Sequence, residues 1–221
     1  SDIIKIDYPK DANSSTNDAE LQITAYTDTN TGTPNNPDYS PTLIHAAIYI
    51  PIGGTKEAGL DFTATYDDSG SANSATISYF VNPYTLTLSF DNTKSASASE
   101  SFNLSNAGKT VIGMGLTATW ASSTAKSSGQ DPTALSGYVQ LGKVKFDGTV
   151  DTQVQNPQSP NDVIKISVSS DGASVGQVKW IQDPNTGEWV PYIVYNDGNT
   201  KDKLEDKFAD LITALQNYGI I

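Results

Sequence analysis

Apolar and polar residues alternate along most of this chain with a period of two. The clearest run extends from Tyr84 to Phe90, where apolar side chains occupy every second position and Ser or Thr the positions between. This alternation is typical of half-buried β-strands, and clusters of Gly, Pro, Asn, Asp and Ser separate the runs. We predict about a dozen short strands, centred on residues 3–8, 20–27, 42–50, 60–66, 75–81, 84–90, 112–120, 138–147, 163–169, 176–182 and 188–195.

The strand pattern predicts an all-β fold of the jelly-roll or immunoglobulin-like sandwich type, because no long helical segments separate the strands. The C-terminus alone has helical spacing, and we expect one amphipathic helix docked on the sandwich, with a partner-binding helix as the alternative. Asn199 or Thr200 is the expected start, Asp202 lies in the expected first turn, and Gly219 is the expected end. The apolar stripe comprises Leu204, Phe208, Leu211, Ile212 and Leu215.

Two polar stretches divide the chain. Residues 9–19 separate a first apolar strand from the rest, and residues 149–162 precede a final hairpin and helix. We therefore expect an N-terminal strand and tether (1–19), a main sandwich (20–150) and an extension packed on it (151–221). The Ser- and Ala-rich segments 69–76, 94–101 and 121–129 are expected to be loops or polar edge strands.

Composition removes several classes of function. The chain has no Cys, one His, 13 Lys without any Arg, and a net charge of -12. Without Cys the chain can form neither disulfides nor thiolate metal sites. Nucleic-acid binding is disfavoured, because a nucleic-acid binder relies on basic residues. No apolar run reaches the roughly 20 residues that span a bilayer, so we expect no membrane insertion. The first residue is Ser1, which favours a processed, secreted chain at the cell surface.

Several acidic turn sequences suggest a site that binds calcium. Carboxylate and amide oxygens are the ligands that Ca²⁺ prefers, although every one of these motifs is also an ordinary turn sequence. Asp183 to Gly187 has the form D-x-N-x-G and is expected to be a hairpin turn. The candidate ligands for a structural Ca²⁺ are Asp28, Asn30, Asp67, Asp68, Asp183, Asn185, Asp197 and Asn199.

We find no catalytic constellation. His45 lies in an alternating run and is interpreted as a strand residue on a polar face, and the chain lacks the G-x-S-x-G elbow of a serine hydrolase. A carbohydrate-binding surface is the alternative use of the aromatic residues, against core packing. Its candidate residues are Trp120, Trp180, Trp189 and Tyr192.

One region resembles a known family. Leu86 to Asp91, then Leu104 to Gly113, then Val139 to Phe146 (VQLGKVKF) follow one another in an order similar to that of cohesin-like domains of secreted bacterial proteins, over about residues 40–148. The resemblance implies a β-sandwich, an extracellular setting, no catalysis and protein–protein association. Because the chain adds residues 163–221 to this pattern, the resemblance carries no dockerin-contact residue over to it.

Together these features predict a secreted, non-enzymatic structural subunit that assembles with copies of itself into a filament, tubule, matrix or surface layer. The N-terminal segment could complete a neighbour's sheet by strand addition, or could fold back onto its own sheet. The expected assembly residues are Ile3, Ile4, Ile6 and Tyr8. The alternative is a cohesin-like or carbohydrate-binding module that recognises a partner protein or a polysaccharide.

Overall fold

The computed structural model describes residues 4–217, with the backbone alone at 210–212 and 214–217. Fourteen strands and three helices lie in this range, so the predicted all-β class is confirmed. The chain divides into two compact units, which we call unit 1 (residues 1–115) and unit 2 (residues 116–221). Strands of the expected main sandwich therefore fall in both units.

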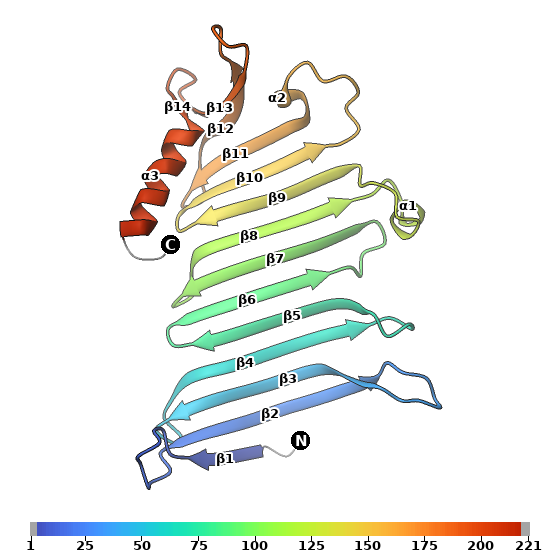
Figure 1. Ribbon diagram of the computed structural model, residues 1–221, viewed down its shortest axis with the longest axis vertical. Helices are drawn as coiled ribbons and strands as arrows, with labels where there is room; N and C mark the ends of the chain where they lie inside the picture. Colours follow the sequence, from blue (N-terminus) through green and yellow to red (C-terminus); the bar gives the residue numbers. More distant parts are fainter. Residues whose placement is uncertain (1–3, 218–221) are drawn as a thin grey trace. The chain divides into compact units, whose positions relative to one another are not determined.

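In unit 1 the strands form an antiparallel meander, in which each strand pairs with its neighbours in the sequence (Figure 1). The following strand, β8 (Lys109–Thr119), contains the boundary between the units. The strands of unit 1 are β1 (Ile4–Tyr8), β2 (Ala19–Asn30), β3 (Tyr39–Ile50), β4 (Thr55–Tyr66), β5 (Ala72–Val81), β6 (Tyr84–Asp91) and β7 (Ser97–Asn106).

Unit 2 contains a second antiparallel meander, again in sequence order. Its pairing is interrupted by one bulge between β11 and β12, after Val168. Both units thus have meander pairing, and the predicted sandwich or jelly-roll type is not confirmed. The strands of unit 2 are β9 (Ala134–Leu141), β10 (Val144–Asp151), β11 (Ile164–Ser170), β12 (Ala173–Gln182), β13 (Trp189–Tyr195) and β14 (Lys201–Lys203).

All three helices lie in unit 2. The predicted C-terminal helix is α3 (Leu204–Asn217), which contacts β13 and β14. The helix starts later than expected: the Asp197 carboxylate accepts hydrogen bonds from the backbone of Asn199 and Thr200, which therefore form a turn. Asp202 lies in β14 rather than in the helix, and Gly219 lies outside the described residues. Sequence analysis missed two helices of one turn, α1 (Ser123–Ser127) and α2 (Pro160–Val163).

Two strand predictions needed correction. The expected strand at 138–147 is a hairpin, because Gly142 has a φ of 56° and turns the chain between β9 and β10. The Ser- and Ala-rich segment at 94–101 contributes the first half of β7, a full-length strand that pairs with β6 from Ser99 onward.

The hydrophobic core is thin. The buried apolar residues are few and mostly small, and no described large side chain is less than 2% exposed. In unit 2 a small cluster of Val168, Val178 and Ile193 is buried, with Trp180 and Leu204 packed against it. In unit 1 the described residues hold no helix, so its sheet has no second layer of its own. Large apolar side chains of that sheet consequently remain exposed.

Candidate association face of unit 1

The sheet of unit 1 carries all its large apolar rows on one side, which we call the apolar face. Register places these residues opposite one another, so they form rows that run straight across the strands. The first row is Tyr26, Ile44, Phe62, Ile77, Leu88 and Phe102; the second is Ile23, Ala46, Leu60, Tyr79, Leu86 and Leu104; the third is Leu21, Ile48, Ala58, Val81 and Tyr84.

These rows arise directly from the period-two alternation. Successive side chains of a strand point to opposite faces, and antiparallel register aligns the apolar positions of neighbouring strands. Strand β1 extends the face, since Ile4 pairs with Ile23 and Ile6 with Leu21. The apolar face therefore continues from β1 to β7.

Much of the apolar face is exposed. Val81 is 63% exposed, Tyr26 55% and Leu88 41%, and Ile4, Ile6, Tyr79 and Tyr84 are exposed as well. An exposed apolar area of this extent is uncommon on a monomeric protein.

The opposite side of the same sheet, the polar face, is rich in hydroxyl groups. Thr63, Thr76, Ser89 and Ser101 form one row, and Ser89 and Ser101 share a hydrogen bond of 2.6 Å. His45 lies on this face, with its Nδ1 2.7 Å from the Asp61 Oδ1, as expected for a strand histidine on a polar surface. Ser78 and Thr87 share a second hydroxyl–hydroxyl bond on this face, at 2.9 Å.

The N-terminal strand folds back onto its own sheet. β1 pairs antiparallel with the first five residues of β2, from Ala19 to Ile23. On the polar face, Lys5 Nζ lies 3.1 Å from the nearly buried Glu20 Oε2, and Gln22 donates a hydrogen bond to the same carboxylate. The Gln22 hydrogen bond and the neighbouring Lys5 lower the pKa of Glu20 despite its partial desolvation. Of the expected assembly residues, Ile3 lies outside the described residues.

The tether between β1 and β2 is short and internally bonded. The Lys10 backbone N–H donates to Asp18 Oδ1 at 2.8 Å, and Lys10 Nζ lies 3.4 Å from Asp18 Oδ2. The Lys10 backbone hydrogen bond is the main reason why the pKa of Asp18 is lowered. These bonds close the segment from Pro9 to Asp18 into a compact connection.

The predicted calcium ligands are divided between the two units, and Asp28 and Asn30 lie at the end of β2 rather than in a turn. Four lie in unit 1 and four in unit 2, and the latter are at opposite ends of β13: the Asp183 turn precedes the strand and the Asp197 turn follows it. In unit 1 the two connections do meet, because a Cβ on Gly70 would lie 2.6 Å from the Thr31 carbonyl oxygen. Across the described residues, no group of three or more His, Asp or Glu side chains is arranged to hold a metal ion.

The same turns show what several of these oxygens do. Asp67 Oδ1 accepts hydrogen bonds from Ser69 Oγ and from the backbone N–H groups of Ser69 and Ser71. Asn30 Oδ1 accepts from the backbone of Gly32 and Asp38. The Asp183 turn is the expected hairpin, with the Gly187 N–H donating to the Asp183 carbonyl at 2.8 Å. These side chains stabilise their own turns.

The four candidate aromatic residues are divided by the sheet of unit 2. Register puts Trp180 and Trp189 on one face of the β12–β13 hairpin and Tyr192 on the other. Trp180 packs against the buried cluster, and Trp120 donates its indole N–H to the Gln130 carbonyl at 2.7 Å. They therefore do not form a single platform for a sugar.

Sequence analysis did not single out the rows on β3 to β7 as an interaction surface, although the alternation that produces them was visible. Within residues 4–217, no helix has the length and apolarity to cross a bilayer. Comparisons with family models, with curated proteins and with solved structures found no match to this chain.

Proposed function

We propose that this chain is a non-enzymatic, extracellular structural subunit that associates with copies of itself through the apolar face of unit 1. The observation that carries the proposal is the set of apolar rows on a sheet that has no second layer within its own unit. A sheet hydrophobic on one side has to bury that side against another layer.

The exposed area is large enough for a stable contact. The seven most exposed residues of the apolar face present roughly 700 Å², taking about 200 Å² for a fully exposed large side chain. A stable interface buries roughly 800 Å² on each partner. The remaining residues of the rows, which are half-buried, add to this area.

Charge favours a second copy as the partner. Each chain carries a net charge of -12, so copies repel one another over most of their surface. The three apolar rows contain no charged residue. Glu100, opposite Phe90, lies on the same face but outside the three rows, so two copies can approach along the rows without bringing like charges into contact. Two sheets stacked in this way, about 10 Å apart, would make a β-sandwich between copies, which is how we interpret the sandwich that the alternation predicts.

Face-to-face contact alone gives a dimer, so growth into a filament or layer needs a further contact. The N-terminal strand can supply it, if β1 of one copy replaces β1 of the next on β2. Described strands leave the outer side of β2 unpaired from Thr24 onward, which adds an open edge. Exchange of this kind preserves the main-chain bonds of β1 and needs only the opening of the tether.

The face is tested by introducing one charge on either side of the same sheet. We expect Leu88→Glu and Tyr79→Glu, on the apolar face, to shift the full-length chain toward monomer in sedimentation velocity and light scattering. Thr63→Glu adds the same charge on the polar face and is the matched control. A wild-type chain that is monodisperse and monomeric at high concentration would overturn the proposal.

The contribution of β1 is tested separately by deleting residues 1–10. Loss of large assemblies, with the circular dichroism spectrum unchanged and a dimer retained, supports strand exchange; the dimer should be weaker, because the deletion removes Ile4 and Ile6 from the apolar face. A loss of thermal stability without any change in assembly supports the intramolecular strand instead.

We also retain structural Ca²⁺ as part of the proposal. Its support is the oxygen-rich connection pair of unit 1, where the loop after Asn30 touches the turn that follows Asp67 and Asp68. Calcium would act there by bridging the β2–β3 and β4–β5 connections, which lie at the same end of the strands.

A further inference from the structure

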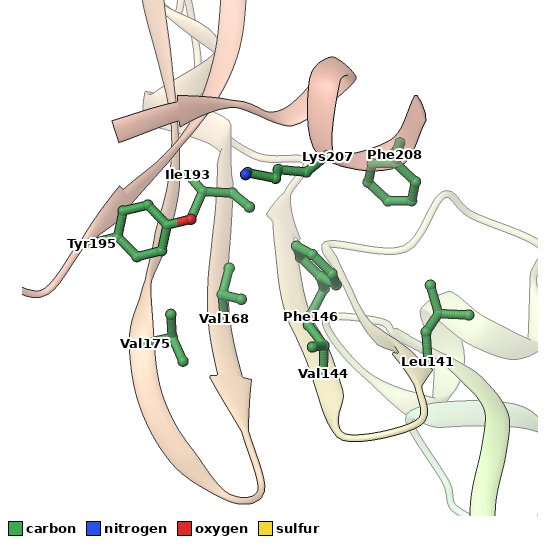
Figure 2. A pocket seen from close by; sticks show the side chains of 9 residues that line it. All are labelled: Leu141, Val144, Phe146, Val168, Val175, Ile193, Tyr195, Lys207 and Phe208. Carbon is green, nitrogen blue, oxygen red and sulfur yellow. The ribbon is translucent and has the colours of Figure 1, made fainter. Parts of the chain in front are cut away.

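Unit 2 contains an apolar cavity of about 280 Å³ between helix α3 and its sheet. Figure 2 shows side chains from the strands pointing into this space, with Lys207 and Phe208 entering from the helix. Phe146 and Phe208 form one wall, with ring centroids 5.9 Å apart. The floor is the buried cluster that includes Val168 and Ile193.

The cavity has its origin in the backbone. Phe146, Val168, Gly176 and Tyr195 form one row across β10 to β13, and the glycine contributes no side chain to it. A Cβ at Gly176 would lie 2.2 Å from the Val194 carbonyl oxygen, so the two strands leave no room for one. Beside it, Val175 is the extra residue of the bulge, and its side chain lines the cavity. Bulges commonly redirect a side chain in this way.

The polar atoms at the cavity bond to one another. The Tyr195 hydroxyl donates to Asp202 Oδ2 at 2.8 Å, and Lys207 Nζ lies 3.4 Å from the same oxygen. The remaining lining residues are aliphatic or aromatic. A ligand in this space therefore meets apolar surface and a lysine whose charge is already balanced by a carboxylate.

We propose that this cavity binds a small uncharged apolar molecule, such as an alkyl chain of about eight carbon atoms with a neutral head group. An apolar cavity of about 150 Å³ accommodates benzene, and this one has roughly twice that volume. An anionic head group is disfavoured, because Lys207 is paired with Asp202 and the chain carries a net charge of -12. The proposal does not rest on self-association.

The test uses 1-octanol and octanoate, which have the same chain length and differ in charge. We expect 1-octanol to raise the melting temperature of the full chain in a saturable way. It should also shift the methyl resonances of Val168, Val175 and Ile193 in the methyl-labelled protein. Octanoate at neutral pH should bind at least tenfold more weakly. Equal affinity for octanoate would overturn the choice of a neutral ligand.

Val175→Phe fills the cavity and is expected to weaken 1-octanol binding at least tenfold. Val194→Phe is the matched control, because Val194 lies on the opposite face of β13. If Val175→Phe does not fold, the methyl shifts of the wild type still decide the question. No methyl shifts in the cavity, or shifts confined to the apolar face of unit 1, would overturn the proposal.

Discussion

The hydroxyl group of Tyr195 donates a hydrogen bond of 2.8 Å to the Asp202 carboxylate, and this bond joins β13 to the strand that leads into α3. Lys207 Nζ lies 3.4 Å from the same carboxylate oxygen. The three groups connect strand, strand and helix at one end of the cavity. Their bonds hold α3 over the sheet together with the contact between Phe146 and Phe208.

Tyr195→Phe should therefore destabilise unit 2 by about 0.5–1.5 kcal/mol, the usual contribution of one hydrogen bond. The bond to Asp202, then burial, raises the pKa of Tyr195 above its ordinary value of 10.0. The folded state holds this proton more tightly, so the stabilisation is complete below pH 10 and is lost as pH rises through the raised pKa. Urea unfolding of both proteins from pH 7 to 11 measures the difference. A gap that stays constant to pH 11 would contradict the argument.

At acid pH the stabilisation from the Tyr195–Asp202 hydrogen bond depends on the ionisation of Asp202. The Tyr195 hydrogen bond, followed by Lys207, lowers the pKa of Asp202 below 3.8. The stabilisation is present above pH 3.8 and is lost as pH falls through the lowered pKa. Wild type and Tyr195→Phe should converge in free energy of unfolding as Asp202 becomes protonated. Asp202→Asn, which removes the titrating group, should show no such convergence when paired with the same Phe substitution.

Gly176 provides a test of the strand packing that shapes the cavity. Ala at this position would place its Cβ 2.2 Å from the Val194 carbonyl oxygen, forcing β12 and β13 apart. We expect Gly176→Ala to cost more than about 2 kcal/mol, as an overpacked core does. Gly148→Ala is the control in the same unit, because its Cβ would meet Ile166 at an ordinary 3.5 Å. Equal melting temperatures for the two variants would show that the strands yield easily.

The strands could be predicted where alternation is continuous. The run from Tyr84 to Phe90 was predicted as one strand and forms one strand, β6, because one of its faces is apolar and the other carries only Ser and Thr. The hairpin at Gly142 was missed although the sequence contains its signal. Val139 and Leu141 are two apart, as are Val144 and Phe146, but Leu141 and Val144 are three apart. This slip in phase marks a two-residue turn.

The cavity and the exposed rows could not be predicted from the sequence. The cavity depends on the bulge at Val175 and on Gly176 lying opposite Tyr195, and register between strands has no local signature. Alternation predicts an apolar side for each strand of unit 1, but it does not reveal whether that side is covered. The acidic turns were ambiguous for a different reason: Asp67 bonds to the backbone two and four residues ahead, and the same residues would suit a cation.

Removal of calcium tests the proposed site at the connections of unit 1. If Ca²⁺ bridges the connections of unit 1, millimolar Ca²⁺ should raise the melting temperature relative to EDTA, because it binds the folded state. Asp67→Asn should lower the melting temperature in both media, since Asp67 holds its own turn. The informative quantity is therefore the difference between Ca²⁺ and EDTA, which the variant should reduce. Identical melting curves of the wild type in both media would exclude a stabilising calcium site.

The N-terminal strand places a carboxylate opposite another carboxylate, and this repulsion affects strand exchange. Asp7 lies directly opposite Glu20 in the register of β1 and β2, while Lys5 reaches the same glutamate diagonally at 3.1 Å. Like charges directly opposite on a sheet are destabilising, by about 0.2–1 kcal/mol. We expect Asp7→Asn to slow amide hydrogen exchange at Ile4 to Tyr8, and Lys5→Gln to accelerate it. If assembly requires β1 to leave its own sheet, Asp7→Asn should also slow the formation of large species, whereas Lys5→Gln should accelerate it. Exchange rates that change without any effect on assembly would show that β1 stays with its own chain.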